Sequence, residues 1–153
     1  MYLGPFASPA RMVQLSEASI THVLNVGEAP SVLATGRDAI REVAWHPIVD
    51  LERIPFETAI TCLETLHRMV CVPESRVYVH CVAGWNRSPT VVWLYLVACG
   101  IEKATARKLI ERNAPDAVPC HSKLIDDTLV EAVRRHGKAH FLPHRRPKAI
   151  AGI

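Results

Sequence analysis

Residues 80–88, His-Cys-Val-Ala-Gly-Trp-Asn-Arg-Ser, place a thiol, a guanidinium and a hydroxyl within one short segment. Five residues separate Cys81 from Arg87, a spacing that lets the backbone N–H groups converge on one centre and bind an anion. The planar guanidinium of Arg87 can hold two oxygens of a phosphate at once. Gly84 suits a position where the backbone takes a positive φ or approaches a ligand closely. The segment therefore predicts a phosphate-binding loop made of Val82, Ala83, Gly84, Trp85, Asn86 and Arg87.

Cys81 is predicted to lie in the surroundings of an activated thiol. Loop N–H groups, the N-terminus of a following helix and a nearby guanidinium all favour the thiolate, which is the nucleophile for in-line attack on phosphorus. The alternative is a purely structural role, in which Cys81 packs in the core and Arg87 lies on the surface. The pattern favours hydrolysis of phosphomonoesters through a phosphocysteine intermediate. A phosphate-binding module without catalysis is the alternative from another class, but it would lack a nucleophile, an arginine or an acid.

The elements on either side of this segment fit a loop between a strand and a helix. Residues 76–80 alternate Val77 and Val79 with Tyr78, which predicts a short buried strand. Pro89 is favoured at the first position of a helix, and residues 90–99 are apolar all round before Gly100. We expect a buried central helix that begins at Ser88 or Pro89.

Strands and helices alternate along the rest of the chain. We expect a short strand within residues 1–6 that ends at Gly4-Pro5, and further strands over residues 21–26 and 42–49. We expect helices from Ser8-Pro9, from Pro55, over residues 103–112 and over residues 122–135. The 153 residues are enough for one core, and hydrophobic and charged fractions of 49% and 22% are those of a globular protein. The predicted fold is a single α/β domain with a twisted central sheet of four to five mostly parallel strands flanked by helices.

The net charge of +3 is unevenly distributed. No acidic residue follows Glu131, whereas six basic residues do: Arg134, Arg135, Lys138, Arg145, Arg146 and Lys148. We expect a catalytic domain over residues 1–136 and a basic C-terminal tail over residues 137–153, which is a solvated terminus or, alternatively, a contact for nucleic acid or anionic lipid.

Five cysteines, Cys62, Cys71, Cys81, Cys99 and Cys120, are too far apart in sequence for a paired zinc motif. Their odd number and the absence of an N-terminal signal pattern predict a reduced, cytoplasmic protein. The longest strongly apolar stretch, residues 91–99, is too short to span a membrane. We expect the cysteines other than Cys81 to be core residues, with one of them as an alternative resolving thiol.

His80-Cys81 and Arg87-Ser88 together resemble the signature of the cysteine-based protein tyrosine phosphatase superfamily, particularly the small dual-specificity phosphatases. Residues 2–4, 21–26 and 46–50 and the apolar helix resemble segments of that family in the same order. The resemblance implies a twisted sheet wrapped by helices, with no metal or organic cofactor. It implies a phosphorylated protein as substrate, bearing phosphotyrosine or phosphoserine and phosphothreonine, and we expect a monomer whose loop can also hold phosphate or sulfate.

The resemblance also assigns roles to side chains beyond the nucleophile and the arginine. Asp50, on a loop upstream of the cysteine, matches the acid that protonates the leaving group and then activates water, and Glu52 is its rival. Ser88 assists release of the Cys81 thiolate, although a serine before proline is also a good helix cap. His80 is implied to hold the loop by bonding nearby backbone, as a buried structural histidine.

Trp85 and Asn86 stand where common dual-specificity loops have small residues, and they resemble the RNA 5′-triphosphatase branch of the same superfamily. Trp85 would then stack on a phenyl ring or a nucleobase; the alternative is a tryptophan packed outward against a neighbouring loop. An RNA 5′-phosphatase or triphosphatase is therefore the less favoured alternative, because the resemblance links Asp50 to the protein phosphatases. Lysines typical of phosphoinositide phosphatases are absent from the loop.

Overall fold

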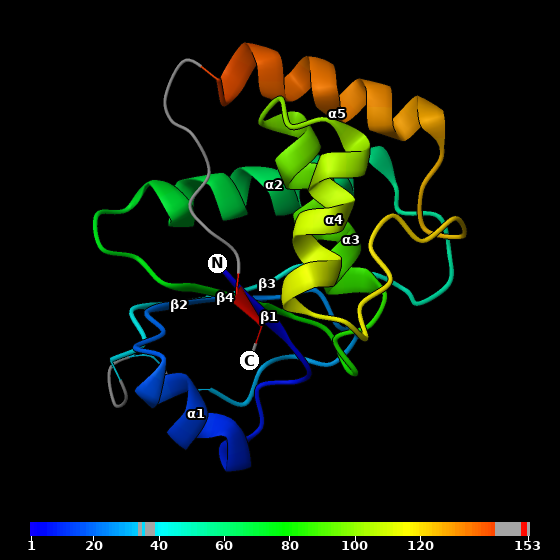
Figure 1. Ribbon diagram of the computed structural model, residues 1–153. Coiled ribbons are helices and arrows are strands. Elements are labelled where there is room, and N and C mark those ends of the chain that lie inside the picture. Colours follow the sequence, from blue (N-terminus) through cyan, green and yellow to red (C-terminus); the bar gives the residue numbers. More distant parts are fainter. Residues whose placement is uncertain (34, 36–38, 143–150, 153) are drawn as a thin grey trace.

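The computed structural model describes residues 1–33, 35, 39–142 and 151–152 as a sheet covered by helices (Figure 1). The sheet has the strand order β3-β2-β4-β1-β5, and all of its pairings are parallel. Its strands are β1 (Tyr2–Gly4), β2 (His22–Asn25), β3 (Glu42–Trp45), β4 (Val77–His80) and β5 (Ala151–Gly152). The α/β architecture with four to five parallel strands, which the sequence predicts, is confirmed.

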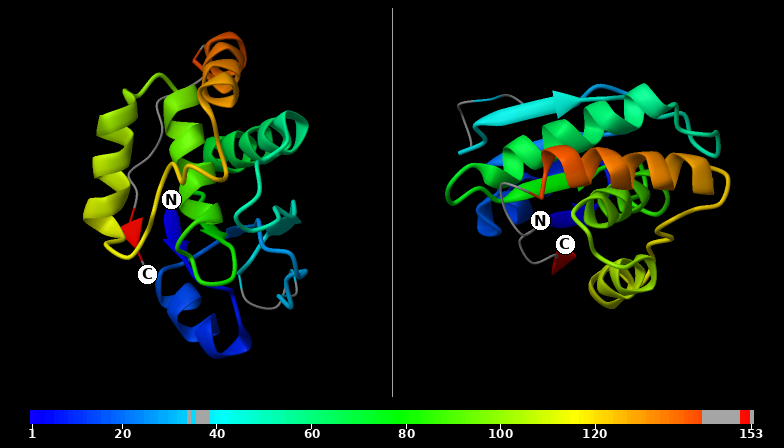
Figure 2. Two further views of the ribbon diagram at one scale, coloured as in Figure 1. Left: turned by 90° about the vertical axis from the view of Figure 1, so that its right-hand side faces the viewer. Right: turned by 90° about the horizontal axis from the view of Figure 1, so that it is seen from above.

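Helices cover both faces of the sheet. The short helices η1 (Pro9–Arg11) and α1 (Met12–Glu17) lie on one face. The other face carries four longer helices, as the view from above shows (Figure 2). They are α2 (Phe56–Cys71), α3 (Arg87–Ala98), α4 (Lys103–Asn113) and α5 (Asp127–His140). Two apolar clusters fill the layers, a large one under the four helices and a small one around Leu15 and Tyr78 near α1.

The central strand β4 places residue 81 at the carboxyl edge of the sheet. Leu24 of β2 pairs with Val79, and Leu3 of β1 pairs with the same residue from the other side. Val26 continues this pairing beyond β2, because its N–H donates to the carbonyl oxygen of His80 at 2.8 Å. In parallel sheets with helices on both faces, ligands bind outside the carboxyl ends of the strands, and Cys81 lies there.

Helix α3 follows the loop and forms the centre of the helical layer. All of its residues are buried, which explains why the segment is apolar all round and shows no polar face. Helix α5 crosses it closely, since a Cβ atom at Gly137 would collide with the backbone of Ala98. The loop is therefore attached to a fully buried helix that packs closely against α5.

Three boundaries differ from the sequence prediction. Strand β3 ends at Trp45 rather than at residue 49, because Pro47 lacks a backbone donor and the strand lies half-exposed at the edge of the sheet. The chain still runs beside β2, since Ile48 donates to Val26 at 3.2 Å. The expected strand over residues 42–49 is thus a strand followed by an extended loop that carries Asp50.

Helix α3 begins at Arg87, with Asn86 as its N-cap residue. The prediction that Ser88 caps this helix is wrong, because Ser88 lies inside the first turn. Helix α5 begins at Asp127 rather than at residue 122, because Asp126 caps it by accepting a hydrogen bond from the N–H of Leu129 at 2.7 Å. It continues past the expected domain boundary at residue 136 to His140, so Arg134, Arg135 and Lys138 are helical.

The remaining basic residues of the expected tail, Arg145, Arg146 and Lys148, lie outside the described residues. None of the helices in the described part of the chain is long and apolar enough to cross a membrane.

Candidate active site

The loop between β4 and α3 is bonded to neighbouring segments through two of its carbonyl oxygens. The carbonyl of Val82 accepts from the N–H of Phe6 at 2.8 Å, and that of Trp85 accepts from the N–H of Val118 at 2.7 Å. Within the described part of the chain, the N–H groups of residues 82–86 donate to no other residue. A loop held by its outer carbonyls presents its amide groups to the interior of the curl, an arrangement that suits a phosphate-sized anion.

Gly84 is required by the packing of this loop. Its φ is +79°, and a Cβ atom there would lie 2.6 Å from the carbonyl carbon of Gly4 and 2.9 Å from the nitrogen of Pro5. The close approach is therefore to the backbone that follows β1. The residue combines the positive φ and the close contact, although the contact is with the protein rather than with a ligand.

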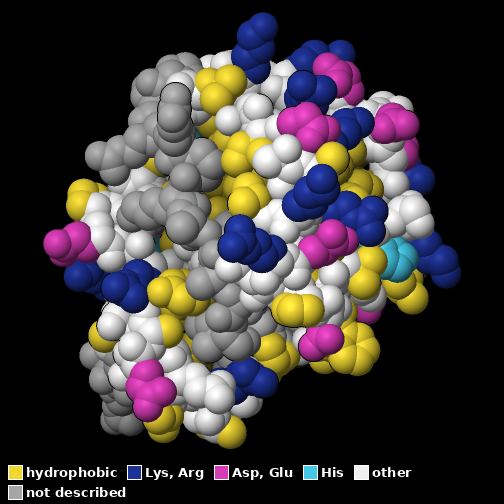
Figure 3. All heavy atoms as spheres, viewed as in Figure 1, with side chains coloured by type: hydrophobic (Ala, Val, Ile, Leu, Met, Phe, Trp, Pro, Cys, Tyr) yellow, Lys and Arg dark blue, Asp and Glu magenta, His cyan; other side chains and the backbone are white. Residues whose placement is uncertain are grey.

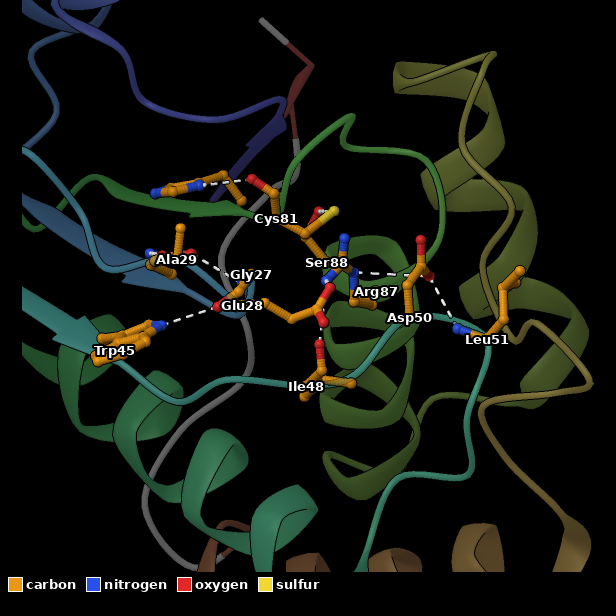
Figure 4. Close-up of polar contacts among 12 residues, drawn as sticks. Gly27, Glu28, Ala29, Trp45, Ile48, Asp50, Leu51, Cys81, Arg87 and Ser88 are labelled. Carbon is orange, nitrogen blue, oxygen red and sulfur yellow. Dashed lines mark hydrogen bonds and ion pairs between the residues drawn. The ribbon is translucent and has the colours of Figure 1, made fainter.

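Arg87 is the first residue of α3, and its side chain is only 5% exposed. Its Nη1 donates to Oε2 of Glu28 at 3.0 Å and to the carbonyl oxygen of Ile48 at 3.1 Å (Figure 4). Its Nε lies 3.6 Å from Oδ1 of Asp50 and has no hydrogen-bond partner among the described residues. Two carboxylates from different loops thus converge on one buried guanidinium.

Glu28 is the residue of this site that sequence reasoning missed. It follows a turn closed by Asn25, whose Oδ1 accepts from the N–H of Gly27 at 2.8 Å and whose Nδ2 donates to Ala29 at 2.8 Å. The indole N–H of Trp45 also donates to Gly27 at 2.8 Å. The available signal was positional, because an acidic residue just after β2 lies at the same carboxyl edge as the residue after β4.

Ser88 lies next to the candidate nucleophile. Its Oγ donates to Sγ of Cys81 at 3.4 Å, and both side chains are buried. Because Ser88 is fixed in the first turn of α3, the hydroxyl has little freedom to leave the sulfur. A hydroxyl donor at this distance stabilises negative charge on sulfur.

His80 supports the base of the loop. Its Nδ1 lies 3.0 Å from the carbonyl oxygen of Cys81, and its ring packs against Phe6 and Tyr78 with centroid distances of 5.4 and 5.6 Å. Burial lowers the pKa of His80 below its ordinary value, although its backbone hydrogen bond opposes this. The neutral ring is therefore the form that the fold accommodates.

The structure separates the two candidate acids. Asp50 faces Arg87, and its Oδ1 also accepts from the N–H of Leu51 at 3.1 Å. Its side chain is 39% exposed, so an entering molecule can reach it. Leu51 holds a left-handed φ of +59°, which fixes the turn that presents this carboxylate. Glu52 is exposed, and within the described residues no contact joins it to the loop.

Trp85 and Asn86 face outward to different degrees. Trp85 is 58% exposed and lies next to Val118, which is 45% exposed. Asn86 is half-buried, and its side chain makes no capping hydrogen bond. The indole is therefore available at the rim of the loop rather than packed away.

The other cysteines do not share this environment. Cys62 and Cys99 are buried core residues, as predicted, and burial raises the pKa of Cys62 to about 12 and that of Cys99 to about 11. The expectation of a core position is wrong for Cys71 and Cys120, which are half-buried, and all four of these thiols are free. Core thiols with raised pKa values are poor nucleophiles at neutral pH.

Comparisons with known proteins show the family to which the chain belongs. The chain is 28% identical over 122 residues to human dual specificity protein phosphatase 15, covering 78% of this chain and 39% of that protein. It is 30% identical over 97 residues to the protein-tyrosine-phosphatase IBR5 of Arabidopsis thaliana, covering 63% of this chain and 34% of that protein. It therefore spans only about a third to two fifths of the length of these relatives.

A solved structure of DUSP15 has the same fold, with a TM-score of 0.70 over 91% of this chain and 90% of that chain at 23% identity. Residues 7–150 match the family model described as PTP-SAK, Swiss Army Knife protein, DSP-PTPase phosphatase domain. The chain therefore belongs to this family of dual-specificity-type phosphatase domains, within the cysteine-based protein tyrosine phosphatase superfamily.

Proposed function

We propose that this protein hydrolyses phosphomonoesters through a phosphocysteine intermediate on Cys81. The observation that carries the proposal is the loop around Cys81. The carbonyl oxygens of Val82 and Trp85 are bonded to neighbouring segments, while the N–H groups of residues 82–86 have no protein acceptors in the described chain. The loop residues Val82, Ala83, Gly84, Trp85, Asn86 and Arg87 would hold the phosphate oxygens. Membership of a phosphatase family supports this reading.

In the first step, the Cys81 thiolate attacks phosphorus, the S–P bond forms, and the bond from phosphorus to the ester oxygen breaks. Protonated Asp50 gives its proton to the departing oxygen, which leaves as an alcohol or phenol. Arg87 stabilises the charge on the transferring group through Nε, the buried donor without a protein acceptor in the described chain. Its Nη1 stays bonded to Glu28 and Ile48, so the plane of the guanidinium is fixed.

In the second step, a water molecule attacks phosphorus and Asp50, now a carboxylate, accepts the proton of that water. The S–P bond breaks, and the sulfur leaves as a thiolate stabilised by the hydroxyl of Ser88 at 3.4 Å. Inorganic phosphate is released with Cys81 and Asp50 in their starting forms. His80 takes no proton in this sequence and holds the loop through the carbonyl of Cys81.

The substrates that we propose are phosphotyrosine and phosphoserine or phosphothreonine in proteins of the cytoplasm. The names of the curated relatives, a dual specificity phosphatase and a protein tyrosine phosphatase, support this class. Figure 3 shows Lys and Arg interspersed with Asp and Glu on one face of the molecule, and not a basic stripe among the side chains drawn there. Nucleic-acid binding relies on basic stripes, so the side chains drawn on this face add no support for an RNA substrate.

Phosphate release from three substrates tests this proposal: 4-nitrophenyl phosphate, phosphotyrosine and phosphothreonine peptides, and an oligonucleotide with a 5′-triphosphate. We expect turnover of the aryl phosphate and the peptides, and none by Cys81→Ser. Retained turnover in Cys81→Ser would contradict the mechanism. If the oligonucleotide is the preferred substrate and its turnover falls steeply with salt, the substrate is RNA rather than protein.

A further inference from the structure

A hollow of about 360 Å³ lies on the outer side of the phosphate-binding loop. The loop after β4, the segment after β1 and the connection between α4 and α5 meet there in both orientations of the ribbon (Figures 1 and 2). Residues that line it include Pro5, Arg11, Ala83, Trp85, Pro115 and Asp116. We call it the flanking hollow. It shares the wall of residues 83–85 with the site around Cys81, so one loop separates the two.

Arg11 gives the flanking hollow a positive charge that the protein does not neutralise by direct contact. Its Nη1 donates to the amide oxygen of Gln14 at 3.2 Å, and within the described residues it forms no ion pair. Arg11 shares this lack of an ion pair with some other described arginines, such as Arg76 and Arg135, whereas Arg68 is paired with Glu42 at 2.5 Å. What distinguishes Arg11 is its place in the wall of the flanking hollow. A guanidinium with spare donors beside an open hollow suits a carboxylate from another molecule.

The remaining walls limit what this molecule can be. Asp116 puts a negative charge in the same hollow, and Pro5, Pro115 and the exposed face of Trp85 are apolar. A mixed-sign, partly apolar hollow repels a chain of phosphates at Asp116 while it still attracts a single carboxylate at Arg11. This combination fits a peptide rather than a nucleic acid.

We propose that the flanking hollow binds an acidic side chain of the protein substrate, close in sequence to the phosphorylated residue, and that Arg11 is the residue that selects it. The proposal rests on the proposed phosphatase function of Cys81. An extended peptide advances about 3.3–3.6 Å per residue, and one loop divides the hollow from the thiol, so the acidic side chain belongs to a residue near the phosphorylated one in sequence. Trp85, exposed on that loop, provides the apolar surface over which the peptide passes.

The two charges of the hollow predict opposite effects. Arg11→Gln removes the attraction, whereas Asp116→Asn removes the repulsion that opposes an acidic ligand. Neither residue contacts Cys81, Arg87 or Asp50 in the described structure, so neither change alters the chemistry of the loop. Arg135→Gln, on the exposed face of α5, is the matched control for the loss of one positive charge.

The test compares kcat/KM for phosphotyrosine peptides that carry a single Glu at successive flanking positions with that for the matching Gln peptides. We expect the wild-type protein to prefer Glu at one of these positions by about two- to fivefold, as exposed ion pairs allow. Arg11→Gln should abolish the preference, Asp116→Asn should increase it, and Arg135→Gln should leave it unchanged. All four proteins should hydrolyse 4-nitrophenyl phosphate equally.

If the wild-type protein shows no preference for Glu, or if Arg11→Gln keeps that preference, the flanking hollow does not bind an acidic side chain through Arg11. Normal turnover of the aryl phosphate in the same experiment would still support the phosphatase function. Loss of aryl phosphate turnover by the wild-type protein would instead overturn the phosphatase function itself. Arg11-dependent turnover of a triphosphate-ended oligonucleotide, without a peptide preference, would also contradict the proposal.

Discussion

Oε2 of Glu28 lies 3.0 Å from Nη1 of Arg87, and this ion pair joins the turn after β2 to the first residue of α3. The arginine is buried, whereas the Glu28 side chain is 58% exposed. Because Nη1 also bonds the carbonyl of Ile48, the guanidinium is held from one end and its Nε remains free of protein hydrogen bonds in the described chain. Glu28 therefore orients the arginine and does not itself contact phosphate in the proposed mechanism.

Glu28→Gln should lower kcat/KM for 4-nitrophenyl phosphate by about tenfold, since a charge-assisted hydrogen bond becomes a neutral one. We expect the loss chiefly in KM for substrate and in the inhibition constant for inorganic phosphate, because the arginine binds the oxygens of both. Steady-state kinetics measure these constants. Glu17→Gln, at an exposed glutamate of α1 without a contact to the loop among the described residues, is the control. Unchanged phosphate inhibition in Glu28→Gln would show that the pair has no role in orientation.

Asp50→Asn should slow turnover most for substrates whose leaving oxygen is strongly basic. Removal of a general acid typically costs about 10²–10⁴-fold when the leaving group needs a proton. An alkyl phosphate, with its basic alkoxide, should therefore lose more activity than 4-nitrophenyl phosphate. A plot of log kcat against the leaving-group pKa checks this. Equal losses for all leaving groups, or a larger effect from Glu52→Gln, would remove Asp50 from the role.

Gly84 and Gly100 have the same left-handed backbone conformation but differ in the space available for a Cβ atom. Comparing alanine variants of the two therefore distinguishes the effect of backbone strain from that of a steric clash. Gly84 and Gly100 have φ values of +79° and +85°, so alanine strains both. At Gly100 a new Cβ atom would lie 3.5 Å from Cδ2 of the Leu142 side chain, which is an ordinary contact. At Gly84 it would lie 2.6 Å from backbone of Gly4, so the loop itself must move.

We expect Gly100→Ala to cost about 1–2 kcal/mol of unfolding free energy and to keep its activity. Gly84→Ala should lose phosphate binding and turnover out of proportion to any loss of stability. Urea unfolding and phosphate inhibition, measured on both variants, make the comparison. Full activity in Gly84→Ala would mean that the loop is not held against the backbone after β1.

Acid should destabilise the protein through half-buried His46 and buried His80. Burial lowers the pKa of His46 and of His80 below the ordinary value of 6.5. The unfolded chain therefore binds protons that the folded chain excludes, and the free energy of unfolding should fall as the pH drops below about 6.5. This stability is fully present above that pH.

His46→Gln should reduce this pH dependence, since glutamine can still bond Oγ1 of Thr65, the partner of the histidine at 2.8 Å. Exposed His140, changed to Gln, is the control. Urea unfolding between pH 7.5 and pH 5.5 measures the slope for each protein. A wild-type slope of zero, or an equal reduction in both variants, would contradict the assignment.

The loop could be predicted from the sequence because its chemistry is local. Cys81, Arg87 and Ser88 lie within one strand-loop-helix unit, so their spacing determines their geometry. Asp50 was placed by family resemblance, and the structure adds that it approaches Arg87. Glu28 could not be predicted with the same means, since its position depends on the parallel pairing of β2 with β4 and on the turn held by Asn25.

Element boundaries were less predictable for a related reason. The alternation of residues 42–49 suits a strand, but the half-exposed edge position of β3 and the missing donor of Pro47 end it at Trp45. Ser88 has the preference of a helix cap, yet the loop delivers Arg87 already in helical conformation. In both cases tertiary contacts decided between local preferences that the sequence permits.

The central claim is a covalent bond between phosphorus and the sulfur of Cys81. Asp50→Asn, mixed with 4-nitrophenyl phosphate and quenched in acid, should accumulate this intermediate, because the leaving group departs without an acid while hydrolysis lacks its base. Peptide mass spectrometry should then find one phosphoryl group on Cys81 and none in the double variant with Cys81→Ser. Turnover without any phosphorylated Cys81, or a phosphoryl group on a different residue, would contradict the mechanism.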